Sequence, residues 1–226
     1  MSELQYNLDI RPYPASNAIP DWYKSISPMT KDPNRDSHPE GQQATVKKCY
    51  PIKDSLLSGY IIPLTADIYV KKLPDIDGPV LSWRTTYDLV SPWHREVSNH
   101  FELPKTQHPQ VFKLHAQWRI QTPKGYSCLF THPYGYPNTP FKTISGIVDT
   151  DILTTDINSP FTIANDFEGI IEAGTPMVQI IPFKRDSWEA EFIKGTWEQY
   201  QVEINKLKTK YWDFYARFQH QPKKYK

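Results

Sequence analysis

The chain has 226 residues, with 26 Lys and Arg against 25 Asp and Glu, so its formal net charge is +1. This length allows one large β-rich domain or two small ones, and the balanced charge argues against a nucleic-acid coat or an acidic tail. The chain contains 21 prolines and only 9 glycines. Because proline is excluded from helix interiors and central strands, we expect many short strands joined by rigid connections.

Residues 1–45 are predicted to form an extended arm punctuated by proline. The exception is a short helix that begins after Pro20, in the sequence PDWYK. The N-terminus shows no basic and apolar signal sequence, and no apolar run approaches the length of a membrane span. We therefore expect a soluble intracellular protein without membrane contact.

Residues 46–185 are predicted to form the β-domain. Residues 45–52 (TVKKCYPI), SGYIIPL and ADIYVKK are typical of strands closed by turns. Residues 111–120 alternate between apolar and polar side chains, as a half-buried strand does. The turn QTPKG then leads into YSCLFTHP, and we expect these two strands to pair as a hairpin.

After residue 185 the pattern changes to apolar residues spaced by four and three positions, which indicates a helix over residues 186–218. Asp186 or Ser187 offers an N-cap. The helix is expected to pack on the same domain, and the alternative is pairing with a partner chain, possibly in a homo-oligomer. Residues 219–226 form a basic tail.

The two cysteines, Cys49 and Cys128, each lie in an apolar, strand-like run, and we expect two buried, reduced thiols. Neither has the spacing of a zinc site, and no glycine-rich phosphate loop or nucleophile elbow is present. No cofactor or metal is expected.

Three motifs occur in the order and spacing of a known group. They are PKGY at 123–126, GIVD at 146–149 and IEAGTPMVQII at 171–181. They resemble the trimeric dUTPase and dCTP-deaminase group, and the resemblance covers residues 112–183. It implies a mainly β protein with a distorted antiparallel β-barrel or β-roll. Where that group has a Tyr-Arg-Gly run, this chain has Thr150-Asp151-Ile152, although Asp149 and Gln179 remain in place.

The whole chain is similar to an uncharacterised family of tailed-bacteriophage proteins with distant bacterial relatives. The motifs that carry this resemblance include IPDWYK, KKCYPIKDSLLSGY, PKGYSCLFTHP and GTPMVQIIPFKRDSWE. The resemblance implies a phage-encoded protein, located in the host cytoplasm or the virion, and supplies no activity.

Asp149 and Asp151 are two positions apart, so on a strand both side chains would share a face. With His132 they could hold a divalent metal or act as a general base. The alternative is that Asp149 binds turn backbone and Asp151 is solvated.

The sequence THPYGYPN at 131–138 is the best candidate for a binding loop. Tyr134 and Tyr136 flank a glycine between two prolines, and Asn138 supplies an amide. Aromatic rings on a rigid loop can stack on a base or sugar or anchor a protein partner, or they can cap the end of a barrel.

The missing catalytic motifs favour a non-enzymatic protein that binds phage structural or host proteins. The alternative is a nucleotide- or metal-dependent enzyme that uses Asp149, Asp151, His132 and Gln179.

Overall fold

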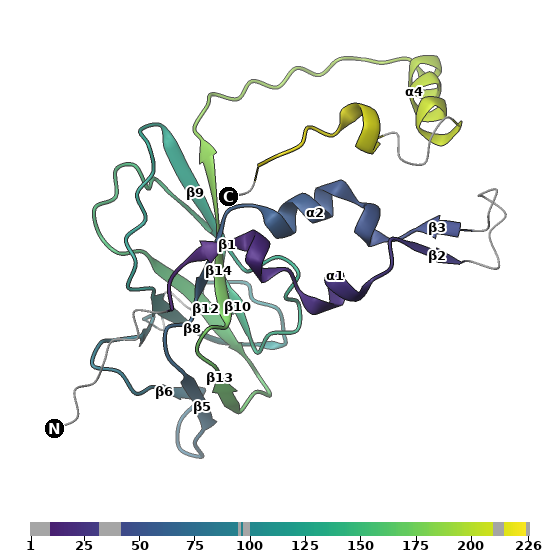
Figure 1. Ribbon diagram of the computed structural model, residues 1–226. Coiled ribbons are helices and arrows are strands. Elements are labelled where there is room, and N and C mark those ends of the chain that lie inside the picture. Colours follow the sequence, from purple (N-terminus) through teal and green to yellow (C-terminus); the bar gives the residue numbers. More distant parts are fainter. Residues whose placement is uncertain (1–9, 32–41, 95, 97–99, 210–214, 225–226) are drawn as a thin grey trace. The chain divides into compact units, whose positions relative to one another are not determined.

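The structure, a computed structural model, describes residues 10–31, 42–94, 96, 100–209 and 215–224 (Figure 1). The polar sequence at 31–43 predicts a solvated loop, and most of it, residues 32–41, lies outside the described part of the chain. Among the described residues, β-structure dominates, and every strand pair is antiparallel. The mainly β prediction is therefore confirmed.

The largest sheet has five strands, in the order β1-β4-β14-β9-β11. Their bounds are Tyr13–Pro14 (β1), Tyr60–Pro63 (β4), Pro176–Lys184 (β14), Tyr126–Thr131 (β9) and Gly146–Val148 (β11). A second sheet has the order β10-β12-β8-β7. Its strands are Phe141–Thr143 (β10), Asn158–Ala164 (β12), Gln107–His115 (β8) and Val90–Pro92 (β7).

Two smaller sheets complete the β-structure, in the orders β13-β5-β6 and β2-β3. Their strands are Gly169–Ile171 (β13), Ile68–Lys72 (β5), Pro79–Ser82 (β6), Met29–Lys31 (β2) and Gln42–Ala44 (β3). Buried side chains from the five-, four- and three-stranded sheets form one continuous core. Phe141 and Phe161 are both almost completely buried in it.

The expected barrel is not closed, because each sheet is open at both edges. Three of these edge strands carry prolines, Pro14 in β1, Pro79 in β6 and Pro92 in β7. Proline has no backbone N–H to donate to a further strand, so it suits a sheet edge and opposes closure. The likeness to the dUTPase barrel stays a prediction.

The strand expected at 45–52 is wrong. Residues Val46–Lys48 form a 3₁₀ turn, η2, and Tyr50–Leu57 form helix α2. The hydroxyl of Thr45 caps η2 by accepting a hydrogen bond from the amide of Lys47. Pro51 lies in the first turn of α2, where its missing N–H costs no helical hydrogen bond. The short helix expected after Pro20 is confirmed as α1 (Asp21–Ser25), and it follows a 3₁₀ turn, η1 (Ala15–Ala18).

The expected hairpin is also wrong, because β8 pairs with β12 and β7 while β9 pairs with β14 and β11. The strand expected over 111–120 ends at His115. Two residues later Gln117 has φ of 58°, a left-handed conformation that interrupts the strand. Residues 116–125 therefore carry the chain from one sheet to the other.

The long helix expected over 186–218 is not confirmed. Residues 186–196 have no regular secondary structure, helix α4 spans Trp197–Thr209, and Tyr215–Gln219 form a short π-helix, η3. The start of α4 is set by a capping box at Thr196. Its hydroxyl accepts from the amide of Gln199, and the Gln199 side chain accepts from the amide of Thr196.

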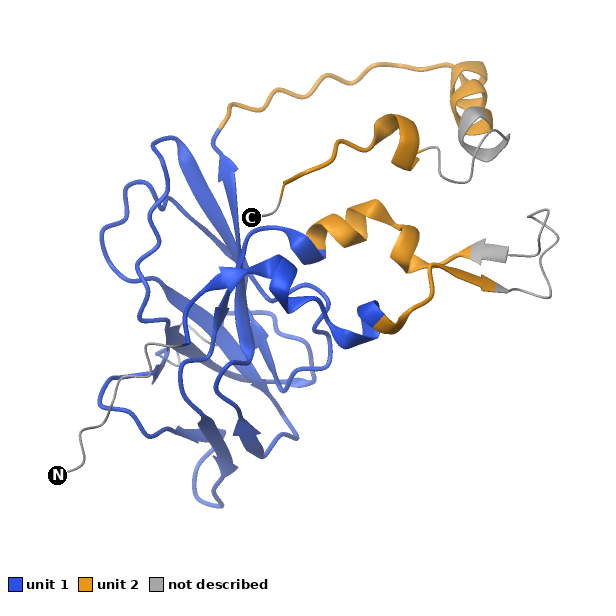
Figure 2. Cartoon of the chain, viewed as in Figure 1, with its two compact units in different colours: residues 1–24, 56–185 blue, residues 25–55, 186–226 orange. Residues whose placement is uncertain are grey.

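The chain divides into two compact units (Figure 2). Unit 1 comprises residues 1–24 and 56–185, and unit 2 comprises residues 25–55 and 186–226. In the described part of the chain, no helix is long and apolar enough to cross a membrane. The packing of the C-terminal segment on the β-domain stays a prediction.

Candidate binding groove

Unit 1 contains a groove of about 820 Å³ between the N-terminal arm and the candidate binding loop. The arm contributes one wall through η1 and α1, and the loop between β9 and β10 contributes the other. The lining residues are Tyr13, Asn17, Ala18, Ile19, Pro20, Asp21, Trp22, Lys24, Gly135, Tyr136, Pro137, Asn138 and Thr139. Two of the predicted binding residues, Tyr136 and Asn138, therefore line one groove.

Hydrogen bonds across the groove hold the arm against the loop. The indole Nε1 of Trp22 donates to the carbonyl oxygen of Gly135 at 2.6 Å. The hydroxyl of Tyr136 donates to the carbonyl oxygen of Ala18, also at 2.6 Å. Each wall thus supplies an aromatic donor to the backbone of the other, which fixes the separation of the two walls.

Gly135 allows this close approach. Its φ is +84°, and a Cβ at this position would lie 2.5 Å from Leu56 Cδ2 and 2.8 Å from Pro20 Cγ. Only glycine tolerates both the left-handed conformation and the tight contact without strain. The glycine between the two tyrosines is therefore required by the junction of arm and loop.

The loop is also braced from within. The amide of Tyr136 donates to the carbonyl oxygen of Pro133, and the ammonium of Lys142 donates to that of Pro137 at 2.7 Å. Thr139 donates through its hydroxyl to the carbonyl oxygen of Phe141. These bonds join the loop to itself and to the first residues of β10.

His132 is part of this bracing. Its Nδ1 accepts from the amide of Thr143 at 3.3 Å, so the proton of the neutral ring lies on Nε2, which donates to the carbonyl oxygen of Tyr136 at 2.9 Å. Burial lowers the pKa of His132, and the positive charge of Lys142 lowers it further, against an opposing effect of the bond to Tyr136. The imidazole is therefore neutral at pH 7 and serves as a support for the loop.

The other two predicted binding residues do not line the groove. The amide of Tyr134 donates to Oε1 of Gln179 at 2.9 Å, and Nε2 of Gln179 donates to the carbonyl oxygen of Ser58 at 2.7 Å. The Gln179 side chain is buried at 1% exposure, and its hydrogen bond to Tyr134 connects the loop to β14. Tyr134 lies on the outer side of the loop with 40% of its surface exposed.

Several polar groups of the groove remain available to a ligand. The phenol of Tyr13 and the amides of Asn17 and Asn138 have no hydrogen-bond partner within the described residues. Burial raises the pKa of Tyr13, and the nearby Tyr136 raises it further. Burial likewise raises the pKa of Tyr136, with a contribution from Asp21. Both phenols therefore keep their protons at neutral pH and act as hydrogen-bond donors.

The two charged side chains that line the groove, Lys24 and Asp21, have opposite signs and form an ion pair. The Lys24 ammonium donates to the Asp21 carboxylate at 3.0 Å, and both side chains are largely exposed. The groove is thus chiefly a surface of rings, prolines and neutral donors.

The paired carboxylates lie elsewhere, at the beginning of β9. Arg185 binds Asp151 through two hydrogen bonds, of 2.7 and 2.5 Å, and the amide of Gly125 donates to the same carboxylate at 2.8 Å. Arg185 also lies 3.0 Å from Asp149, which accepts from the hydroxyl of Ser127. The bonds from Arg185, followed by that from Gly125, lower the pKa of Asp151 to about 2. Asp151 is thus neither solvated nor open to a metal, while Asp149 is 57% exposed.

The structure does not bring His132 to these carboxylates. Ser127, the partner of Asp149, precedes His132 by five residues along β9 and its extension, a separation of about 16 Å for extended chain. Within the ranges that the structure covers, no three His, Cys, Asp or Glu side chains are grouped so that they could hold a metal ion. The proposed set of Asp149, Asp151 and His132 therefore does not form one site.

Comparison of the chain with protein-family models, with curated proteins and with solved structures found no match. The resemblance to phage proteins stays a prediction, and the groove must be interpreted from its own chemistry.

Sequence reasoning missed the arm's half of the groove, in particular Tyr13, Asn17 and Trp22. A usable signal was present, since two aromatic residues of the arm, Trp22 and Tyr23, follow a proline in a polar segment. Tyr23 is buried, but Trp22 remains 42% exposed, and only the fold distinguishes them.

Proposed function

We propose that this protein is a non-enzymatic binding protein, phage-encoded and either virion-associated or directed at a host protein. In this proposal the groove between arm and loop holds an extended, proline-containing segment of the partner protein. The observation that carries the proposal is the lining of the groove. The rings of Trp22 and Tyr136 line the groove together with Pro20 and Pro137, and further lining residues supply hydrogen-bond donors.

This lining matches the chemistry of a polyproline II segment. Such a segment has no internal hydrogen bonds, so its carbonyl groups need donors from the protein that binds it. Tyr13 supplies a phenol, and Asn17 and Asn138 supply amides. Proline rings pack against aromatic side chains in the grooves that recognise such segments. The groove therefore offers both kinds of contact that this ligand requires.

The rigidity of the loop also supports the proposal. The contacts of His132, Gln179 and Lys142 order the loop in the free protein. A preformed groove binds without the entropy loss of ordering its own loop. Those three residues therefore act as positioning residues for the binding surface.

Binding can be tested with the full chain labelled with ¹⁵N at its tryptophan indoles. The probe is an acetylated hexaproline peptide, and a matched Gly-Ser peptide of the same length is the control. We expect the hexaproline peptide to shift the Trp22 indole resonance in a saturable way and the Gly-Ser peptide to leave it unchanged.

Tyr13→Phe keeps the ring and removes the donor, so it should weaken binding about three- to tenfold, the effect of one hydrogen bond. Tyr60→Phe, at an exposed tyrosine of β4 that does not line the groove, is the matched control. Failure of the hexaproline peptide to bind would refute the proposed ligand. Saturable binding of a neutral oligosaccharide in its place would assign the groove to sugars.

A further inference from the structure

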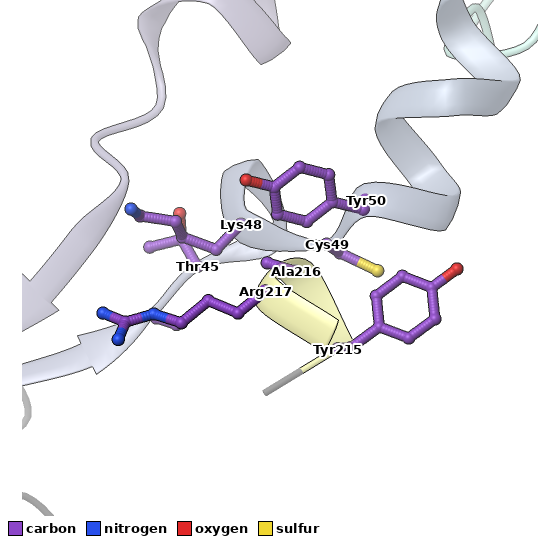
Figure 3. A pocket seen from close by; sticks show the side chains of 8 residues that line it. Thr45, Lys48, Cys49, Tyr50, Tyr215, Ala216 and Arg217 are labelled. Carbon is purple, nitrogen blue, oxygen red and sulfur yellow. The ribbon is translucent and has the colours of Figure 1, made fainter. Parts of the chain in front are cut away.

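Unit 2 contains a separate pocket of about 370 Å³, which Figure 3 shows from close by. One wall comes from the segment between β3 and α2, and the other from η3. The lining residues are Ala44, Thr45, Lys48, Cys49, Tyr50, Tyr215, Ala216 and Arg217. None of them belongs to the groove of unit 1, so this pocket is independent of the function proposed above.

His220 and Asp54 join the two walls of the pocket. The ring of His220 lies 4.6 Å from that of Tyr50 and 6.0 Å from that of Tyr215, measured between centroids. Its Nε2 is 3.1 Å from Oδ2 of Asp54, and both side chains are mostly buried. The aromatic contacts thus place η3 beside the beginning of α2, although the two are far apart in the sequence.

The side chains of the pocket are divided by their chemistry. Figure 3 shows the ammonium of Lys48 and the guanidinium of Arg217 on the same side, near Thr45. The sulfur of Cys49 and the ring of Tyr215 lie on the other side, and the ring of Tyr50 lies between the two groups with its hydroxyl toward Lys48. One half of the pocket is therefore cationic, and the other half is aromatic and of low charge.

We propose that this pocket binds a small phosphate monoester that carries an aromatic ring. Lys48 and Arg217 would hold the phosphate through charge-assisted hydrogen bonds, in which the planar guanidinium can donate to two oxygens at once. The rings of Tyr50 and Tyr215 would contact the ring of the ligand. The volume lies within the range typical of small-molecule sites. Among the described residues that line the pocket, Lys48 and Arg217 are cationic and none is a carboxylate.

Cys49 provides a reporter of occupancy. It lines the pocket and is half-buried, whereas Cys128, the other cysteine of the chain, is completely buried. A neutral thiol reagent such as iodoacetamide should therefore alkylate Cys49 selectively in the folded protein. A ligand in the pocket should slow that reaction.

The experiment measures the rate of Cys49 alkylation by intact mass, at constant ionic strength, with phenyl phosphate, inorganic phosphate or phenol as the probe. We expect phenyl phosphate to slow alkylation about tenfold at ten times its dissociation constant, by mass action. Inorganic phosphate should protect at higher concentration, and phenol should not protect.

The ratio of the alkylation rates without and with phenyl phosphate is then compared among variants. Lys48→Gln and Arg217→Gln should each weaken protection about tenfold, the effect of one charge-assisted bond.

Lys47→Gln is the matched control, because Lys47 neighbours Lys48 in η2 but does not line the pocket. Broadening of the ³¹P resonance of phenyl phosphate gives a second measure that does not depend on Cys49. The proposal is overturned if phenyl phosphate does not slow the alkylation of Cys49 and its ³¹P resonance does not broaden when the protein is added. It is also overturned if phenol protects as well as phenyl phosphate does, or if Lys47→Gln weakens protection as much as Lys48→Gln.

Discussion

The indole nitrogen of Trp22 donates a hydrogen bond to the carbonyl oxygen of Gly135, 113 residues further along the chain. Tyr136 returns a similar bond to the arm at Ala18. Because each bond joins a side chain of one segment to the backbone of the other, the arm and loop form one structural element of unit 1. The groove is lined by both segments, so it depends on these hydrogen bonds between the arm and the loop.

Replacing Gly135 by alanine should disrupt that junction. Both the left-handed φ of +84° and the contacts of the added Cβ with Leu56 and Pro20 oppose the substitution. We expect a loss of about 1 kcal/mol from the backbone and about 1–3 kcal/mol more from the crowding, measured by urea unfolding. Gly125→Ala is the matched control, since Gly125 has φ of +86° and no atom within 4 Å of the added Cβ. Equal losses in the two variants would contradict the packing argument.

The ion pair of Asp151 with Arg185 should make stability depend on pH in acid. Asp151 has a folded-state pKa of about 2 against an ordinary value of 3.8, so the unfolded chain takes up its proton first as the pH falls. The stabilisation is complete above the unfolded pKa and is lost as the pH falls from about 5 to about 2. Asp151→Asn should lower the free energy of unfolding at pH 7 and flatten its decline below pH 5. The measurement is urea unfolding at several pH values. If the free energy of unfolding of Asp151→Asn declines below pH 5 as steeply as that of the unmodified protein, this role is contradicted.

The neutral state of His132 should be visible by NMR. Because burial lowers its pKa below the ordinary value of 6.5, the folded protein binds this proton later than the unfolded chain does. The contribution of His132 to stability is therefore complete above pH 6.5 and is lost as the pH falls below that value. Long-range ¹⁵N spectra should show the tautomer protonated at Nε2 at pH 7. A titration midpoint at or above pH 6.5 would show that the imidazole does not brace the loop as the neutral ring.

The capping box determines where α4 begins. Thr196→Ala removes the hydroxyl that accepts from Gln199, and we expect the helix to lose about 1 kcal/mol, measured by hydrogen exchange of its first amides. Ser187→Ala removes the cap that the periodicity suggested and lies well before the helix, so it should leave the exchange rates unchanged. A larger effect from Ser187→Ala than from Thr196→Ala would place the start of the helix earlier.

Local chemistry was readable in the sequence wherever a motif acts on its neighbours. The sequence TWEQ at 196–199 is a capping box, and it marks the start of α4. Periodicity alone predicts a helix from Asp186, because it shows which residues could share a helix face. It does not show which backbone groups at the start of a helix have hydrogen-bond partners. Residues 45–52 differ from the predicted strand for a related reason. Their apolar content favours a strand, but the cap at Thr45 and the proline in the first turn of α2 favour helical structure.

The composition and the turn residues determined the mainly β class, with its short strands, and they identified the loop around Gly135 as a candidate site. Only the tertiary structure showed that β8 and β9 lie in different sheets, that Arg185 engages the two carboxylates, and that the arm forms half of the groove. The physical reason is the range of the interactions. Strand formation and turns depend on neighbouring residues, whereas the bonds of Arg185 to Asp151 and of Trp22 to Gly135 join residues that only the folded chain brings together.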